Sequence, residues 1–105
     1  MYSAGDKIGL IAGSGEVPIY FARKASQLGM KIVSVGFSDE IQNGLKPYSE
    51  KSYSIGVGQA GKILATFKEN NVKNLLVLGK VDKKIVFKLQ KFDLKALKFL
   101  KNLVT

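Results

Sequence analysis

Short apolar runs, most of them ending at glycine, recur along the chain and constrain its fold more than any other feature. Residues 7–12 (KIGLIA) run into a Gly-Ser-Gly turn, residues 31–37 (KIVSVGF) form a second run, and residues 74–78 (NLLVL) lead into a Gly-Lys turn. Residues 52–57 (SYSIGV) form a shorter run that also ends among glycines. Continuous apolar runs of this length are typical of strands buried on both faces, as in parallel sheets covered by helices.

Helical patterns separate these runs. The first predicted helix begins near Pro18, places apolar residues from Ile19 to Leu28 on one side, and ends at Gly29. The second runs from Gln59 to Asn70, with its apolar residues on one side. The chain therefore alternates between strand and helix.

The other segments have weaker patterns. Residues 38–51 are polar, contain Pro47 and show no clear period, so we expect a loop there, with room for a short helical turn. Residues 81–89 alternate between apolar residues and lysine and favour extended chain. A last helix is expected from Asp93, which is suited to the N-cap position.

The alternation of buried strands and helices predicts an α/β fold: a Rossmann-like, three-layer domain with a mainly parallel sheet of about four strands. The 105 residues suffice for one such domain, so residues 1–105 are expected to form a single domain. In parallel sheets, ligands bind beyond the carboxyl ends of the strands. The glycine turns follow strand ends, so they mark one edge of the predicted domain.

Composition excludes several kinds of chemistry. The chain has no cysteine and no histidine, which removes disulfides, thiolate zinc sites and catalysis by a histidine base. No apolar run approaches the roughly 20 residues of a membrane span, and the amino terminus lacks the basic start of a signal peptide. We therefore expect a cytoplasmic protein.

The net charge of +9 comes from 17 basic and 8 acidic residues, and it is unevenly distributed. Residues 80–101 hold eight lysines against Asp82 and Asp93, which gives this segment 8 − 2 = +6. Such a segment could bind nucleic acid, anionic lipid or a phosphorylated substrate. Readers of bases and phosphates usually prefer arginine, and the chain has only Arg23, so the excess of lysine favours a solvated face and nucleic acid is not the expected partner.

The glycine turns are candidate anion sites. The turns at residues 13–15 and 56–61 lead into predicted helix starts, where backbone N–H groups lack partners and favour anions, and glycine lets a phosphate approach the backbone. A tight turn between a strand and a helix can also need glycine for steric reasons alone. Several such turns at one edge favour the binding interpretation.

Two familiar phosphate motifs match only in part. Residues 13–18 begin like the dinucleotide-binding motif G-x-G-x-x-G, but Pro18 takes the place of the third glycine, and the nearest acidic residues, Asp39 and Glu40, come a few positions late. Residues 56–62 satisfy G-x-x-x-x-G-K, yet Ile63 follows where a P-loop has a hydroxyl for magnesium. A dinucleotide site is weakly signalled, and a P-loop is not expected.

Four motifs together resemble a known family. Residues 9–18 (GLIAGSGEVP) are similar to the opening of the LpxI-type UDP-2,3-diacylglucosamine pyrophosphatases of lipid A biosynthesis. Residues 58–61 (GQAG), 76–81 (LVLGKV) and 93–97 (DLKAL) resemble three later motifs of that family, in the same order and with similar spacing. The resemblance spans nearly the whole chain.

This resemblance implies a hydrolase that splits UDP-2,3-diacylglucosamine into UMP and the acyl-sugar phosphate lipid X with a divalent metal, Mg or Mn. It also implies two domains. We expect the chain to be the N-terminal, substrate-contributing domain, with the catalytic and metal-binding residues on a C-terminal domain that the chain lacks. The isolated chain is then expected to be inactive, with UDP-sugar lipid or UMP, and the C-terminal domain, as its partners.

No catalytic or metal-ligating residue is therefore assigned within the chain, whose eight carboxylates form no clustered pair at helical or strand spacing. The candidate substrate-binding residues come from the glycine turns and their neighbours: Gly13, Ser14, Gly15, Pro18, Gly58, Gln59, Gly61, Gly79 and Lys80. Backbone amides would serve a phosphate or other polar groups, Gln59 would form hydrogen bonds, and Lys80 would supply a positive charge.

Other interpretations stay open. The chain could be a freestanding nucleotide-binding module of Rossmann-like form, or a nucleic-acid binder that uses its lysine-rich end. The apolar side of the last helix, with Leu97, Leu100 and Val104, is expected to pack on the domain's own sheet, with the C-terminal domain or a second copy of the chain as alternatives. A basic amphipathic end could also contact the inner membrane peripherally.

Overall fold

The structure is a computed structural model that describes residues 7–84. Four parallel strands form one sheet in the order β3-β2-β1-β4, with bounds β1 Lys7–Ala12, β2 Lys31–Gly36, β3 Lys51–Ser54 and β4 Leu75–Leu78. Helices α1 (Val17–Gln27), α2 (Asp39–Leu45) and α3 (Ala60–Glu69) connect them, with a short 3-10 helix, η1 (Lys46–Tyr48), after α2. The predicted α/β fold with a parallel sheet of four strands is confirmed.

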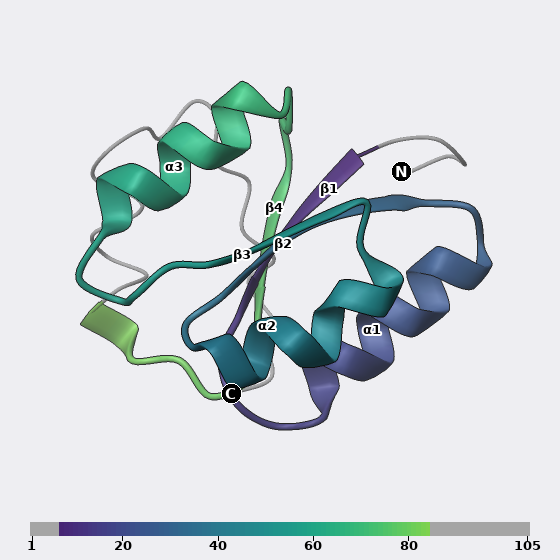
Figure 1. The fold of residues 1–105 in the computed structure, drawn as a ribbon, viewed down its shortest axis with the longest axis horizontal. Coiled ribbons are helices and arrows are strands. Elements are labelled where there is room, and N and C mark those ends of the chain that lie inside the picture. Colours follow the sequence, from purple (N-terminus) through teal and green to yellow (C-terminus); the bar gives the residue numbers. More distant parts are fainter. Residues whose placement is uncertain (1–6, 85–105) are drawn as a thin grey trace.

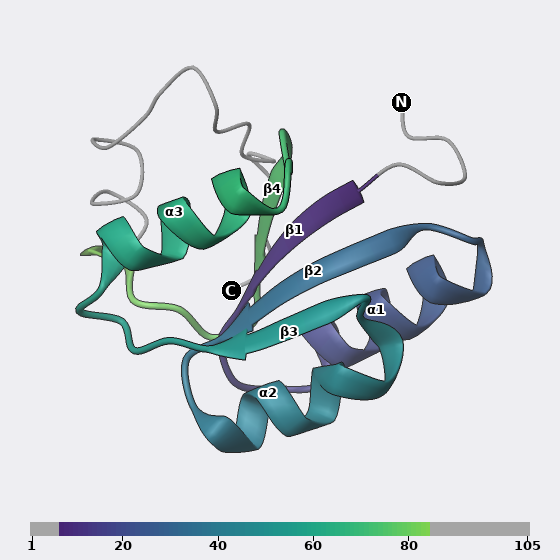
Figure 2. The same cartoon turned by 45° about the horizontal axis from the view of Figure 1, so that its top comes forward.

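The helices cover both faces of the sheet. Helices α1 and α2 lie on one face and α3 on the other (Figures 1 and 2). The buried apolar side chains form two matching clusters: Leu10 and Ile32 pack with Ala22 of α1, whereas Ile11 and Val33 pack on the side of α3. Neighbouring residues of one strand thus enter opposite layers, which is why the strands are apolar at consecutive positions.

Helix α1 follows the sequence pattern closely. Pro18 occupies the first turn, where its missing N–H costs no hydrogen bond, and Ala22 and Ala25 are buried against the sheet. Gly29 follows the helix with a φ of 82°, a left-handed conformation that favours glycine. The small alanines let the helix axis lie close to the strands.

The segment 38–51, expected to be a loop with room for a short helical turn, contains helix α2 and η1. The Oγ of Ser38 accepts a hydrogen bond from the N–H of Ile41 over 3.2 Å and caps α2, and two acidic residues follow in the first turn. Leu45 at the end of α2 is completely buried. A helix of seven residues with one buried anchor shows too little periodicity to be recognised from the sequence.

Other element boundaries also differ from the prediction. Strand β3 ends at Ser54, whereas the expected strand ran from residue 52 to 57. The strand is short because β3 is an outer strand of the sheet and pairs only with β2. Helix α3 and strand β4 are each within one residue of the expected ends. In the segment 81–89, expected to be extended, Lys83 and Lys84 are helical, with the N–H of Lys84 bound to Oδ1 of Asp82 at 2.9 Å. Residues 85–105, with the expected helix from Asp93, lie outside the described residues.

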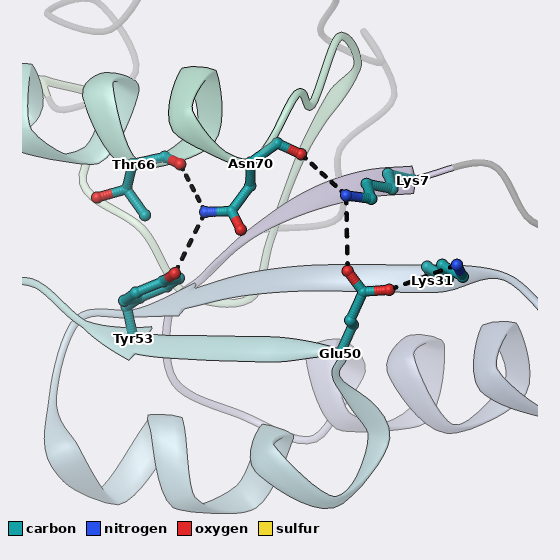
Figure 3. Close-up of polar contacts among 6 residues, drawn as sticks. All are labelled: Lys7, Lys31, Glu50, Tyr53, Thr66 and Asn70. Atoms are coloured by element: carbon teal, nitrogen blue, oxygen red, sulfur yellow. Dashed lines mark hydrogen bonds and ion pairs between the residues drawn. The ribbon is translucent and has the colours of Figure 1, made fainter.

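Polar contacts join the amino ends of the strands (Figure 3). Glu50, just before β3, lies 3.6 Å from the Nζ of Lys7 and 3.7 Å from that of Lys31. The carboxylate thus bridges the first residues of β1 and β2. These contacts are at the opposite edge of the sheet from the glycine turns, since all four strands run in parallel.

Asn70 connects α3 to this network (Figure 3). Its Nδ2 donates to the hydroxyl of Tyr53 at 3.2 Å and to the carbonyl of Thr66 at 2.8 Å, while its backbone carbonyl accepts from the Nζ of Lys7 at 3.2 Å. Asn70 is only 8% exposed, and the bonds to Tyr53 and Thr66 satisfy its side-chain amide nitrogen. Within residues 7–84, no buried side-chain nitrogen or oxygen lacks a partner.

None of the helices described here is long and apolar enough to span a membrane.

Candidate functional site

The carboxyl ends of the strands form one edge of the sheet, because every pair of neighbouring strands is parallel. The turns at residues 13–15, 56–61 and 79–80 follow β1, β3 and β4, so all three are at this edge. In the strand order β3-β2-β1-β4, β1 and β4 are neighbours, so the turns that follow these two strands lie side by side. The end of β2 separates both of them from the turn after β3. The edge thus holds one pair of touching turns and one separate turn.

The turns after β1 and β4 are joined through their backbones. The N–H of Gly13 donates to the carbonyl of Leu78, and the N–H of Lys80 donates to the carbonyl of Ser14, both over 2.9 Å. A Cβ at Gly13 would collide with the carbonyl oxygen of Lys80. Gly79 has a φ of 89°, and a Cβ there would lie 2.8 Å from the carbonyl oxygen of Ser14. These two glycines are needed for steric reasons, and both are buried.

Ser14 and Gly15 have a different environment. Both are exposed. Within residues 7–84, the Gly15 N–H and the Ser14 hydroxyl form no hydrogen bond, whereas the backbone of Ser14 is paired with that of Lys80 in an antiparallel bridge. Gly15 has a φ of 107° with open space on its Cβ side. Among the described residues, the turn after β1 therefore has one unpaired N–H, that of Gly15, and one unpaired hydroxyl, that of Ser14, just before α1 begins.

A cavity of about 220 Å³ opens beside these donors. It lies between the turn after β1, the start of α1 and the start of α2, and its lining is Gly13, Ser14, Gly15, Pro18, Ile19, Ser38, Glu40 and Ile41. Four of the predicted substrate-binding residues are thus brought together: Gly13, Ser14, Gly15 and Pro18. The cavity combines apolar walls with a few polar groups, which is the usual character of small-molecule sites.

Half of the cavity lining was missed by sequence reasoning. Ser38, Glu40 and Ile41 belong to the segment 38–51, which was predicted to be a loop, and Ile19 was predicted only to lie on the apolar side of the first helix. One signal was present: a serine followed by two acidic residues is typical of a helix start, and that start comes shortly after a predicted strand. This helix-start signal would have placed Glu40 near the carboxyl ends of the strands.

The other predicted residues lie outside the cavity. Gly58 and Gln59 precede α3, Gly61 is in its first turn, and all three are exposed. Gln59 closes a turn, with its N–H bound to the carbonyl of Gly56 at 3.1 Å. Lys80 is exposed at the turn after β4. The structure thus forms no single pocket from all the predicted residues.

Within the described part of the chain, no three carboxylates gather into a group that could hold a metal ion. Glu50 and Glu40, for example, belong to opposite edges of the sheet. The residues present there do not fit the divalent metal that the family resemblance implies.

A family model described as the LpxI N-terminal domain matches residues 7–105. The chain belongs to the LpxI N-terminal domain family. The resemblance noted in the sequence is thereby confirmed, and the chain is identified with a domain of a lipid A biosynthesis enzyme. A comparison of the sequence with curated proteins gave no match.

The fold of this LpxI N-terminal domain is similar to parts of larger solved proteins. N5-carboxyaminoimidazole synthetase from Staphylococcus aureus matches with a TM-score of 0.67 and 16% identity, over 87% of this chain and 24% of that one. A quinone oxidoreductase from Pseudomonas syringae pv. Tomato DC3000 matches with a TM-score of 0.55 and 15% identity, over 99% of this chain and 39% of that one. Similarity at these identities concerns the fold alone and supports the Rossmann-like prediction.

Proposed function

We propose that this chain is the substrate-contributing N-terminal domain of a UDP-2,3-diacylglucosamine pyrophosphatase, which forms UMP and lipid X in the cytoplasm. Membership in the LpxI N-terminal domain family supports the pathway. The role of this domain in the reaction is to bind the nucleotide part of the substrate, and the isolated chain does not hydrolyse it.

One observation carries the proposal: the unpaired N–H of Gly15 and the unpaired hydroxyl of Ser14 lie at a cavity on the carboxyl edge of a parallel sheet. Backbone N–H groups before a helix start are suited to phosphate oxygens, because they need no side-chain rearrangement and add the positive end of the helix dipole. Helix α1 begins at Val17, two residues after Gly15. We therefore place a substrate phosphate at residues 14–15.

Other exposed groups at the same edge would extend this contact. The backbone of Lys80 is bonded to that of Ser14, so the ammonium group of Lys80 is a candidate partner for the second phosphate. Gly58, Gln59 and Gly61 lie farther along the edge, and we propose that they contact a more distant part of the substrate. Gly13, Pro18 and Gly79 shape the turns, since they are buried there.

Hydrolysis of a pyrophosphate needs groups that residues 7–84 do not bring together. The reaction needs a metal to stabilise charge and a base to activate water, and no metal-binding group of carboxylates occurs in that range. We propose that Mg or Mn is held by a C-terminal domain of the family, which is then the partner of the edge described above. No step of the reaction is assigned to this chain.

A freestanding nucleotide-binding module is the second candidate. It is supported by the cavity beside Ser14 and Gly15, which has an acidic residue, Glu40, in its lining as dinucleotide sites often do. The two candidates differ in ligand: the first takes uridine nucleotides, and the second takes a nicotinamide dinucleotide.

Calorimetry on the purified chain separates them. We expect weak, saturable binding of UMP and UDP-N-acetylglucosamine and none of NAD, and no turnover of UDP-2,3-diacylglucosamine with added Mg or Mn. Ser14→Ala is expected to weaken UMP binding by about fivefold through loss of one hydroxyl, and Ser26→Ala on the exposed side of α1 serves as the control. Micromolar NAD binding would favour the second candidate, and hydrolysis by the chain would place the chemistry within it.

A further inference from the structure

The charge of the cavity limits what can enter it. Glu40 is the one charged residue in its lining, and within residues 7–84 its carboxylate forms no hydrogen bond or ion pair. The remaining lining groups are glycine backbone, two serines and the apolar side chains of Pro18, Ile19 and Ile41. A phosphate placed deep in this cavity would face an uncompensated carboxylate, which is unfavourable between like charges.

A carboxylate in such a place is suited to hydroxyl groups. Ionised Glu only accepts hydrogen bonds, and its two oxygens match two neighbouring hydroxyls, as in the acidic residue that holds a ribose in dinucleotide sites. Resting on the proposed function, we infer that Glu40 binds the ribose 2′ and 3′ hydroxyls of the uridine nucleotide and selects for them. The phosphates then lie at the cavity opening, toward the N–H of Gly15 and the hydroxyl of Ser14.

The size of the cavity agrees with one sugar ring. Its volume of about 220 Å³ is below the roughly 300–1,000 Å³ of sites that enclose whole drug-sized ligands. Apolar side chains, among them Ile19 and Ile41, can pack against the carbon atoms of a ribose while Glu40 takes its hydroxyls. The base and the phosphates would remain at the cavity opening.

Ser38 holds the segment that carries Glu40. Its Oγ accepts a hydrogen bond from the N–H of Ile41 over 3.2 Å, so the first turn of α2 is fixed on both sides of residue 40. Gly36 at the end of β2 allows this turn to come close, since a Cβ there would lie 2.7 Å from the N of Gln42. The position of Glu40 is therefore set by local packing.

The test measures the affinity of two ligands for the full chain and for two variants of it. Calorimetry is run with UMP and 2′,3′-dideoxyuridine monophosphate on the wild type, on Glu40→Gln and on Asp39→Asn, an adjacent exposed carboxylate that does not line the cavity. The wild type and Asp39→Asn should prefer UMP by about tenfold, the effect of hydrogen bonds to a charged group. Glu40→Gln should lose most of that preference while it binds the dideoxy ligand as the wild type does.

The outcomes distinguish this inference from the function on which it rests. If the wild type binds neither ligand, the proposed function fails, and the role of Glu40 with it. If the wild type prefers UMP and Glu40→Gln keeps the same preference, only the ribose assignment is wrong. It is also wrong if the wild type binds both ligands equally, since the ribose hydroxyls would then contribute nothing to binding.

Discussion

The backbone N–H of Lys80 donates a hydrogen bond to the carbonyl oxygen of Ser14 over 2.9 Å, although the two residues are far apart in the sequence. This bond, part of an antiparallel bridge between the two residues, joins the turn after β4 to the turn after β1 and fixes the backbone from which the Gly15 N–H and the Ser14 hydroxyl project. The candidate site thus depends on contact between two turns whose glycines leave room for each other.

Alanine at either glycine of this contact should therefore destabilise the domain. At Gly13 a Cβ would collide with the backbone of Lys80, and at Gly79 it would add strain at a positive φ. We expect Gly13→Ala and Gly79→Ala each to lower the free energy of unfolding by roughly 2–4 kcal/mol, measured by urea denaturation. Gly58→Ala is the control, because open space surrounds its Cβ position. Equal stability of all three variants would mean that the two turns do not touch.

Asn70 should contribute more to stability than its position at a helix end suggests. Its buried amide bonds to Tyr53 and Thr66, so Asn70→Ala leaves the Tyr53 hydroxyl without this donor and opens a gap at the end of α3. We expect a loss of about 1–3 kcal/mol. Asn43→Ala, on the exposed side of α2, should stay within about 0.5 kcal/mol of the wild type. A loss no larger than that of the control would show that the network is dispensable.

The ion pairs of Glu50 should matter much less. The carboxylate of Glu50 is about a third exposed, and its distances to Lys7 and Lys31 are 3.6 and 3.7 Å. Glu50→Gln is expected to cost less than about 1 kcal/mol at low salt, and the difference from the wild type should shrink in 1 M NaCl because salt screens such pairs. Denaturation at the two salt concentrations measures both. A large loss that salt does not reduce would contradict the assignment.

Helix α2 should be held in place by Leu45. This side chain is completely buried between the sheet and its neighbouring helix, so Leu45→Ala removes apolar contacts at the point where α2 is anchored. We expect a destabilisation of about 2–5 kcal/mol, while Leu28→Ala, at a residue that is 71% exposed, should change stability by less than about 0.5 kcal/mol. Similar values for both would indicate that α2 is not packed on the sheet.

Much of the fold could be predicted from the sequence because its signals are local. The apolar residues 7–12 and 74–78, the proline at the start of α1 and Gly29 at its end each act within a few residues of their own position. Strand β3 was placed less well, since an edge strand is partly exposed and its apolar pattern is weak. Helix α2 was missed because its stability comes from packing of Leu45 on distant residues.

The candidate site could be predicted only in part for the same reason. Ser14 and Gly15 are recognisable because a glycine turn after a buried strand marks the carboxyl edge by itself. Glu40 reaches the cavity through α2, so its role depends on a helix that the sequence pattern does not show. Gly58 and Gln59 are at the predicted edge, but the strand order separates them from the cavity, and strand order is not readable from the residues.

A titration of the ¹⁵N-labelled chain with UMP, followed by NMR, tests the central claim most directly. The amide signals of Ser14 and Gly15 should shift progressively and saturate, while that of Gly29, at the far end of α1, should stay in place. If those two signals do not move while the ligand binds elsewhere, or if UMP leaves the whole spectrum unchanged, the turn after β1 is not a nucleotide site.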